Sequence, residues 1–315
     1  MAVTAAQTPL KDQIKHALDE ILTLITGAEI LIGFQYTAVF NKLFATLPEI
    51  SQYLQVLGLV FLLITLILIM SPVPYHWIAE GGQATRRLCD YVRGVVLIAL
   101  LFFAFGLGID AYIVVEVVGG SLLGVVGGSA AGLAALGFWY AIEYARRRAD
   151  KRAHRKPFDK MNEDEIVPDV TLADKVDHVL TEARVVLPGA QALLGFQFIA
   201  VLAEGFDSLS MTAKYLHLLG LALIALSTIL LMTPAAYHRI VEEGEDTEHF
   251  RQLASRFVLA AMVALALGII LNFYIVVAKV TASPLFAIAS TFLMLLLFFG
   301  FWFGYTFYQR RRKQR

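Results

Sequence analysis

Long uninterrupted apolar runs dominate this sequence, such as VLGLVFLLITLILIM ending at Met70 and FAIASTFLMLLLFFGFWFGY ending at Tyr305. A run of roughly 20 apolar residues matches the ~30 Å hydrocarbon core of a bilayer, because each helical residue rises about 1.5 Å. The chain is 58% hydrophobic and 17% charged, whereas a soluble domain is about 25% charged. The sequence therefore predicts an all-α integral membrane protein.

The chain contains two copies of one pattern, 162 positions apart (189 − 27). The stretch GAEILIGFQYTAV from Gly27 matches GAQALLGFQFIAV from Gly189, and SPVPYHWIAEGG from Ser71 matches TPAAYHRIVEEG from Thr233. A later match, GFWY with GFWF at Gly300, is one residue out of step. Similarity at a fixed period indicates a duplicated structural unit.

Each copy predicts four spanning helices, at 20–40, 52–71, 91–118 and 120–145 in the first and at 182–203, 214–233, 254–280 and 284–308 in the second. An amphipathic segment precedes the first helix of each copy. Its apolar residues share one helical face: Leu10, Ile14, Ala17, Leu18 and Ile21 in the first copy, and Leu172, Val176, Val179, Leu180 and Ala183 in the second. We expect both segments to lie at the membrane interface and to continue into the spanning helices.

Basic residues mark one side of the membrane. They follow the last helix of each copy, in RRRADKRAHRK from Arg146 and RRRKQR from Arg310, and they flank the connections between second and third helices. Because cytoplasmic loops carry the excess of Lys and Arg, we expect eight spans with both termini cytoplasmic. An even number of spans per copy makes the two four-helix repeats parallel. The predicted divisions are a first repeat at 1–148, a charged cytoplasmic linker at 149–170 and a second repeat at 171–315.

Acidic side chains inside spanning helices need a physical reason, because a charge at mid-bilayer costs about 2.5–3.5 kcal/mol on insertion scales. Glu29 lies in the first predicted helix and Asp110 in the third, and their counterparts in the second copy are the amides Gln191 and Asn272. A carboxyl group can carry a proton and an amide cannot. The four residues are therefore candidates for a proton or monovalent-cation path in which only the first half titrates. Alternatively, they hydrogen-bond neighbouring helices and fix their packing.

Each first helix also carries a glutamine in the shared phrase GFQ, at Gln35 and Gln197. Six residues separate each glutamine from Glu29 or Gln191, so it points to a different helical face. We expect these amides to make polar contacts between helices, with a place beside a pore as the alternative.

Two histidines, His76 and His238, follow proline-containing turns at the inner ends of the second helices. Histidine titrates near neutral pH, so this cytoplasmic edge is a candidate pH-sensitive site, and an interfacial Tyr-His pair is the alternative. No group of side chains shows the convergence of a metal site, and no motif for catalysis, cofactor binding or nucleic-acid binding is present. We therefore expect no enzyme, no cofactor and no nucleic-acid partner.

Small residues recur at every fourth position of one predicted helix, at Gly120, Gly124, Gly128 and Gly132. Such a stripe lets helix backbones approach closely, either within the chain or in a homo-oligomer. The bilayer is the expected environment, and the basic clusters are expected to contact anionic lipid.

The phrases EARVVLPGAQALLGFQF and TPAAYHRI resemble a family of small bacterial four-helix membrane proteins of unknown function, whose members are sometimes labelled sodium:proton antiporters. The likeness is greatest over 182–280 and departs in the first copy at Glu29 and SPVPYHW. The resemblance implies a multi-pass protein of the bacterial inner membrane, here as two tandem copies, and favours transport. The functional hypothesis is monovalent-cation or proton transport through a polar site between the repeats. A non-transporting scaffold or regulatory protein that binds partner proteins or lipid is the alternative.

Overall fold

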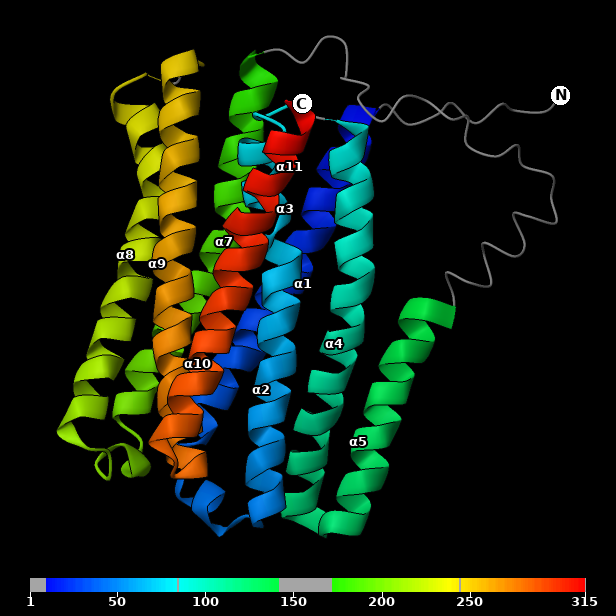
Figure 1. Ribbon diagram of the computed structural model, residues 1–315, viewed down its shortest axis with the longest axis vertical. Coiled ribbons are helices and arrows are strands. Elements are labelled where there is room, and N and C mark those ends of the chain that lie inside the picture. Colours follow the sequence, from blue (N-terminus) through cyan, green and yellow to red (C-terminus); the bar gives the residue numbers. More distant parts are fainter. Residues whose placement is uncertain (1–9, 84, 142–171, 244, 315) are drawn as a thin grey trace, which may run out of the picture.

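The computed structural model of the protein describes residues 10–83, 85–141, 172–243 and 245–314, with the backbone alone for 10–23 and 173–175. Throughout these residues the chain forms helices and the turns between them (Figure 1). This confirms the all-α prediction. The predicted linker and the basic run after Arg146 lie outside the described residues.

Each repeat contributes four long helices. In repeat one they are α1 (Leu10–Ala38), α2 (Glu49–Met70), α4 (Arg86–Gly119) and α5 (Ser121–Leu136). In repeat two they are α7 (Leu172–Val201), α8 (Met211–Ile240), α9 (Glu248–Thr281) and α10 (Pro284–Phe299). The predicted amphipathic segments are the first turns of α1 and α7, because both helices continue without a break into their apolar parts.

Short elements connect and extend these helices. They are the 3₁₀ turns η1 (Lys42–Thr46) and η4 (Glu204–Phe206), the helix α3 (Pro72–Pro74), the π-helical turns η2 (Tyr75–Ala79), η3 (Gly137–Ala141) and η5 (Gly300–Tyr305), and the final helix α11 (Thr306–Lys313).

Seven helical segments of the described chain are long and apolar enough to cross a membrane. They are Glu49–Ala79, Arg86–Gly119, Ser121–Ala141, Val176–Val201, Met211–Ile240, Glu248–Thr281 and Pro284–Lys313. The chain is therefore a multi-pass membrane protein by length and composition. The eighth expected span corresponds to α1 and stays a prediction.

Helix boundaries repeat between the copies for local reasons. The Thr85 side chain accepts a hydrogen bond from the Leu88 amide at 3.2 Å, and Thr247 accepts one from the Phe250 amide at 3.0 Å. Both threonines are N-caps of the third helices. At the other end of α4, Gly120 adopts a positive φ of 82°, which glycine tolerates without a steric penalty. The chain can therefore turn directly into α5.

Proline ends the second helix in only one repeat. Pro72 and Pro74 follow α2, and the chain passes through α3 into the π-helical turn η2. In the matching stretch of repeat two there is a single proline, Pro234, which lies inside a continuous α8. One missing amide donor is tolerated in a helix of this length, whereas two prolines in three residues interrupt the regular α-helix.

The repeats meet along α1 and α7, with α2 beside α9, while α4 with α5 and α8 lie at opposite edges (Figure 1). The ends of α2 and α8, the starts of α4 and α9, and α11 share one end of the bundle (Figure 1, top). We call this the basic end, because it carries Arg86, Arg87, Arg239 and the run Arg310 to Lys313.

The glycine stripe of α5 packs within the chain. A Cβ added at Gly128 would lie 2.7 Å from the Gly108 carbonyl oxygen of α4, and one at Gly124 would lie 3.1 Å from the Tyr112 carbonyl oxygen. Glycine therefore allows the α4 and α5 backbones to touch, as small residues do in other membrane helices.

Candidate functional site

Buried polar side chains occupy the same three positions in each repeat. We call Gln35, Gln55 and Asp110 the first polar triad and Gln197, His217 and Asn272 the second, because each set has one member on each of its repeat's first three helices. Asp110 is half-buried and the other five are buried. A buried polar group is costly unless it has a hydrogen-bond partner. The three positions are nevertheless polar in both repeats, so we take them as candidate site residues.

In the first triad, the Gln35 amide donates a hydrogen bond to the Asp110 carboxylate at 2.6 Å. Gly58 of α2 makes room for this amide, because a Cβ there would lie 3.1 Å from Gln35 Nε2. Gln35, which we expected to make contacts between helices, is thus bonded to Asp110, which we expected in the ion path.

In the second triad, His217 Nε2 lies 3.2 Å from the backbone carbonyl oxygen of Gln197. The Gln197 side chain has no hydrogen-bond partner in the described residues. Asn272 donates to the Gly268 carbonyl at 2.8 Å. Gly220, the counterpart of Gly58, leaves space for the asparagine amide. The sequence signal for Gln55 and His217 is the pair YLQVLGL and YLHLLGL, which becomes informative only when the three helices are assembled.

Glu29 lies apart from both triads, in the contact between the repeats. Its side chain has no solvent exposure, and neither carboxyl oxygen has a hydrogen-bond partner in the described part of the chain. The carboxyl group fills the space beside Gly189 of α7, where a Cβ would overlap it. An unpaired carboxylate here has no compensation for its lost hydration, so this geometry fits the neutral, protonated acid.

The amide counterpart of Glu29 has a different environment. Gln191 is exposed on α7 and does not enter the contact between the repeats. The four residues predicted for an ion path therefore lie in separate places: Glu29 between the repeats, Asp110 and Asn272 inside their own repeats, and Gln191 on an outer face.

A second buried cluster joins the repeats near the basic end. His76 Nδ1 lies 2.7 Å from Glu182 Oε1, and the Trp77 indole donates to Glu182 Oε2. The His178 ring lies 6.1 Å from the His76 ring, measured between centroids. We call these four residues the basic-end cluster. Of these four residues, only His76 is a candidate from the sequence.

The matching histidine of repeat two is less buried. His238 packs on the Phe250 ring at 4.7 Å between centroids, and its Nε2 lies 3.5 Å from an Asp246 carboxylate oxygen. Its counterpart acid by repeat symmetry is Glu20, whose side chain lies outside the described residues. The equivalence of the two histidines thus stays a prediction.

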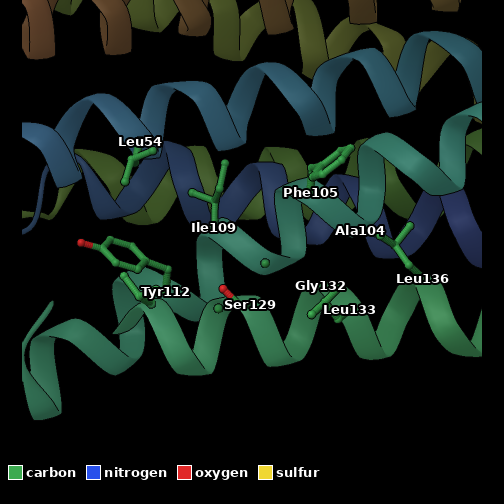
Figure 2. A pocket seen from close by; sticks show the side chains of 12 residues that line it. Leu54, Ala104, Phe105, Ile109, Tyr112, Ser129, Gly132, Leu133 and Leu136 are labelled. Carbon is green, nitrogen blue, oxygen red and sulfur yellow. The ribbon is translucent and has the colours of Figure 1, made fainter. Parts of the chain in front are cut away.

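Two apolar cavities of the described chain have no triad or basic-end residue in their lining. One of about 480 Å³ lies between α2, α4 and α5, and Leu54, Ile109 and Ser129 are among its lining residues (Figure 2). Another of about 600 Å³ lies between α2, α4 and α10. In the described residues no group of three or more His, Cys, Asp or Glu side chains could hold a metal ion.

Comparison with known proteins supports the tandem organisation. The model of a family of unknown function, DUF6328, matches residues 6–143 and again residues 169–306. No curated protein and no solved structure matches the chain. The two matches have the same length and together cover most of the sequence, in agreement with the internal repeat and the paired triads. The chain therefore belongs to the DUF6328 family and contains two tandem copies of its domain.

Proposed function

We propose that this protein transports a proton, or a monovalent cation in exchange for one, along the contact between its two repeats. The observation that carries the proposal is the Glu29 carboxyl group, which is buried between α1 and α7 without a hydrogen-bond partner in the described residues. A protonatable group at the junction of two parallel repeats has the location that many transporters use for their coupling site.

Access to Glu29 from the basic end follows one face of α7. His178 and Glu182 are one turn apart, and Gly189 lies seven residues after Glu182, which returns to the same face about 10 Å farther along the axis. The basic-end cluster therefore lies two turns from the Glu29 carboxyl group. Histidine and glutamate can both accept and release protons, so this cluster supplies the entry or exit step on that side.

A small rearrangement is needed between the cluster and Glu29, because Val185 and Val186 of the intervening turn are buried. On the other side of Glu29, the Tyr36 hydroxyl donates to the Ile269 carbonyl of α9 at 3.0 Å and so joins α1 to repeat two. We infer that a shift of the repeats against each other separates the buried valines and breaks the Tyr36 hydrogen bond at different times. Glu29 would then be reached from one side of the membrane at a time, as in alternating access.

The first triad supports a second protonatable group. Asp110 accepts a hydrogen bond from the Gln35 amide, which holds the carboxyl group in a fixed position, and a carboxyl group can bind and release a proton. Its counterpart Asn272 cannot titrate. We therefore assign proton binding to repeat one and a positioning role to the second triad. We place the basic end in the cytoplasm of a bacterium, because the chain's basic residues gather there.

The test is ion flux in proteoliposomes that carry a pH-sensitive dye. Purified wild-type protein is expected to dissipate a pH gradient faster than empty vesicles, and a response to added Na⁺ or K⁺ separates exchange from simple proton conduction. Glu29→Gln is expected to abolish the flux, and Asp110→Asn to reduce it. Glu204→Gln and Asp207→Asn are matched controls, because both side chains are exposed at the end of the bundle opposite the basic end.

Folded wild-type protein that shows no flux under any of these gradients would contradict transport and favour the non-transporting scaffold. Flux that Glu29→Gln leaves unchanged would refute the assigned site.

A further inference from the structure

The two repeats are buried unequally. In the most apolar stretch of each helix, 72% of residues are buried in the segment containing α2, against 28% in the matching α8. The third helices show the reverse order, with 28% in α4 and 72% in α9. A two-fold contact uses the same surface of both partners and buries equivalent helices equally. The repeats therefore pack head to tail, with the α2 side of repeat one against the α9 and α10 side of repeat two.

The first helices show the same asymmetry. Glu29 and Gly33 of α1 face α7, where they meet Gly189 and the Phe196 ring. The counterparts of Glu29 and Gly33 on α7 are Gln191 and Gly195. Gln191 is exposed, and a Cβ added at Gly195 would meet only open space. The α7 copy of this contact surface is therefore unused within the chain.

The second helices carry identical residues in different environments. Ile67 is 2% exposed and its carbonyl accepts a hydrogen bond from Trp302 at 2.9 Å, whereas the equivalent Ile229 is 61% exposed. Met70 is fully buried and the equivalent Met232 is 51% exposed. Because the residue types are the same, the difference comes from the missing neighbour and not from composition.

The complementary half of the contact is also unused, on repeat one. Gly27 of α1, the counterpart of Gly189, meets only the edge of the Phe103 ring, at 3.8 Å from an added Cβ. Phe34, the counterpart of Phe196, touches the Phe196 ring of its own chain with ring centroids 4.6 Å apart, yet 55% of it remains exposed. Trp139, the counterpart of Trp302, stacks on Phe103 and is only half-buried, whereas Trp302 is fully buried. Two surfaces hold the repeats of one molecule together. Each molecule also carries a second, largely exposed copy of both surfaces.

We propose that a second copy of this chain covers these surfaces by repeating the internal contact. The open face of repeat two (Gln191, Gly195, Phe198, Ile229 and Met232) packs on the open face of repeat one (Gly27, Phe34 and Trp139) of the neighbouring copy. A head-to-tail contact that closes on itself forms a ring without free ends. The assembly is therefore a closed homo-oligomer of at least two chains.

The exposed Gln191 favours a protein neighbour over lipid. A polar amide that faces hydrocarbon is unfavourable, and beside Gly27 of a second copy it would have the space that Gly189 leaves for Glu29. Small residues with a nearby polar side chain are the usual composition of membrane helix contacts. The inference does not depend on transport.

Cross-linking tests the geometry directly. Ile229→Cys is combined with Trp139→Cys in a Cys89→Ser background, and a short bis-maleimide is added to the protein in native-lipid nanodiscs. The pair is expected to link separate chains, because it copies the internal Ile67 and Trp302 contact. A matched pair, Ile67→Cys with Trp302→Cys, is expected to link only within one chain. Ile288→Cys with Trp139→Cys is the negative control, because Ile288 is 57% exposed on α10.

Mass measurement by native mass spectrometry supplies the second readout. Wild-type protein is expected to be an oligomer, and Ile229→Trp is expected to shift at least half of it to monomer, while Ile288→Trp leaves the mass unchanged. A monomeric wild type in nanodiscs, or an oligomer that Ile229→Trp leaves intact, would overturn the proposal. Interchain cross-links at Ile288 in preference to Ile229 would do the same.

Discussion

The fit of Glu29 beside Gly189 gives a sharp prediction for stability. Gly189→Ala adds a Cβ that would lie 2.9 Å from Glu29 Oε1 and closer still to Oε2 and the carboxyl carbon. Carbon and oxygen do not approach this closely without a bond, so the carboxyl group or α7 must move. Overpacking of this kind typically costs about 1–3 kcal/mol. We therefore expect Gly189→Ala to lower the free energy of unfolding by about 2 kcal/mol.

A double-mutant cycle separates this clash from other effects. In a Glu29→Ala background the added methyl group meets no carboxyl group, so the cost of Gly189→Ala should fall to about zero, with a coupling energy of roughly 1–3 kcal/mol. Gly94→Ala is the matched control, because a Cβ there meets nothing within 4 Å and alanine is the better helix former by up to about 1 kcal/mol.

The assay is equilibrium unfolding in mixed micelles by sodium dodecyl sulfate titration, followed by circular dichroism. If Gly189→Ala destabilised the protein equally with glutamate or alanine at position 29, the carboxyl group would not occupy the space seen in the structure. The assignment of Glu29 to the repeat contact would then fail.

Three further substitutions test contacts of the fold, the first by limited proteolysis and the other two in the same unfolding assay. Gly128→Leu should loosen α5 from α4 and make α5 more accessible to protease, because the added Cβ meets backbone atoms that cannot rotate away; unchanged cleavage would contradict the close approach of the two helices. Trp302→Phe should cost about 1 kcal/mol by removing the hydrogen bond to the Ile67 carbonyl, and a shift below about 0.3 kcal/mol would show that this bond adds nothing. Gln35→Met should cost about 1–3 kcal/mol, because it leaves the Asp110 carboxylate without its amide donor; in an Asp110→Asn background the cost should shrink, and an equal loss in both backgrounds would exclude the pairing.

The sequence predicted the helices well because the length of each apolar run is a local property of the chain. The comparison of the two copies then gave the same helices twice. The boundaries of α4 and α9 agree because both helices follow a capping threonine. The tandem matches of the family model confirm the repeat that the phrase GFQ had indicated. The Gln35 pairing, by contrast, depends on how α1 rotates against α4, which no single helix encodes.

The environment of equivalent residues was the least predictable part of the structure. Glu29 and Gln191 have the same position in their repeats, so sequence alone assigned them to one polar path. The structure buries one and exposes the other because the repeats meet head to tail. Glu182 was overlooked for a related reason, since its partners His76 and Trp77 come from a turn of the other repeat.

Transport as proposed requires that the Glu29 carboxyl group carries a proton in its buried position and releases it during the transport cycle. Infrared difference spectroscopy on the wild-type protein in lipid, between acidic and alkaline pH, measures this directly. We expect a carbonyl band of a protonated carboxylic acid that disappears in Glu29→Gln and persists in the control Glu204→Gln. A difference spectrum without a Glu29-dependent band, in protein that is folded and active, would contradict it.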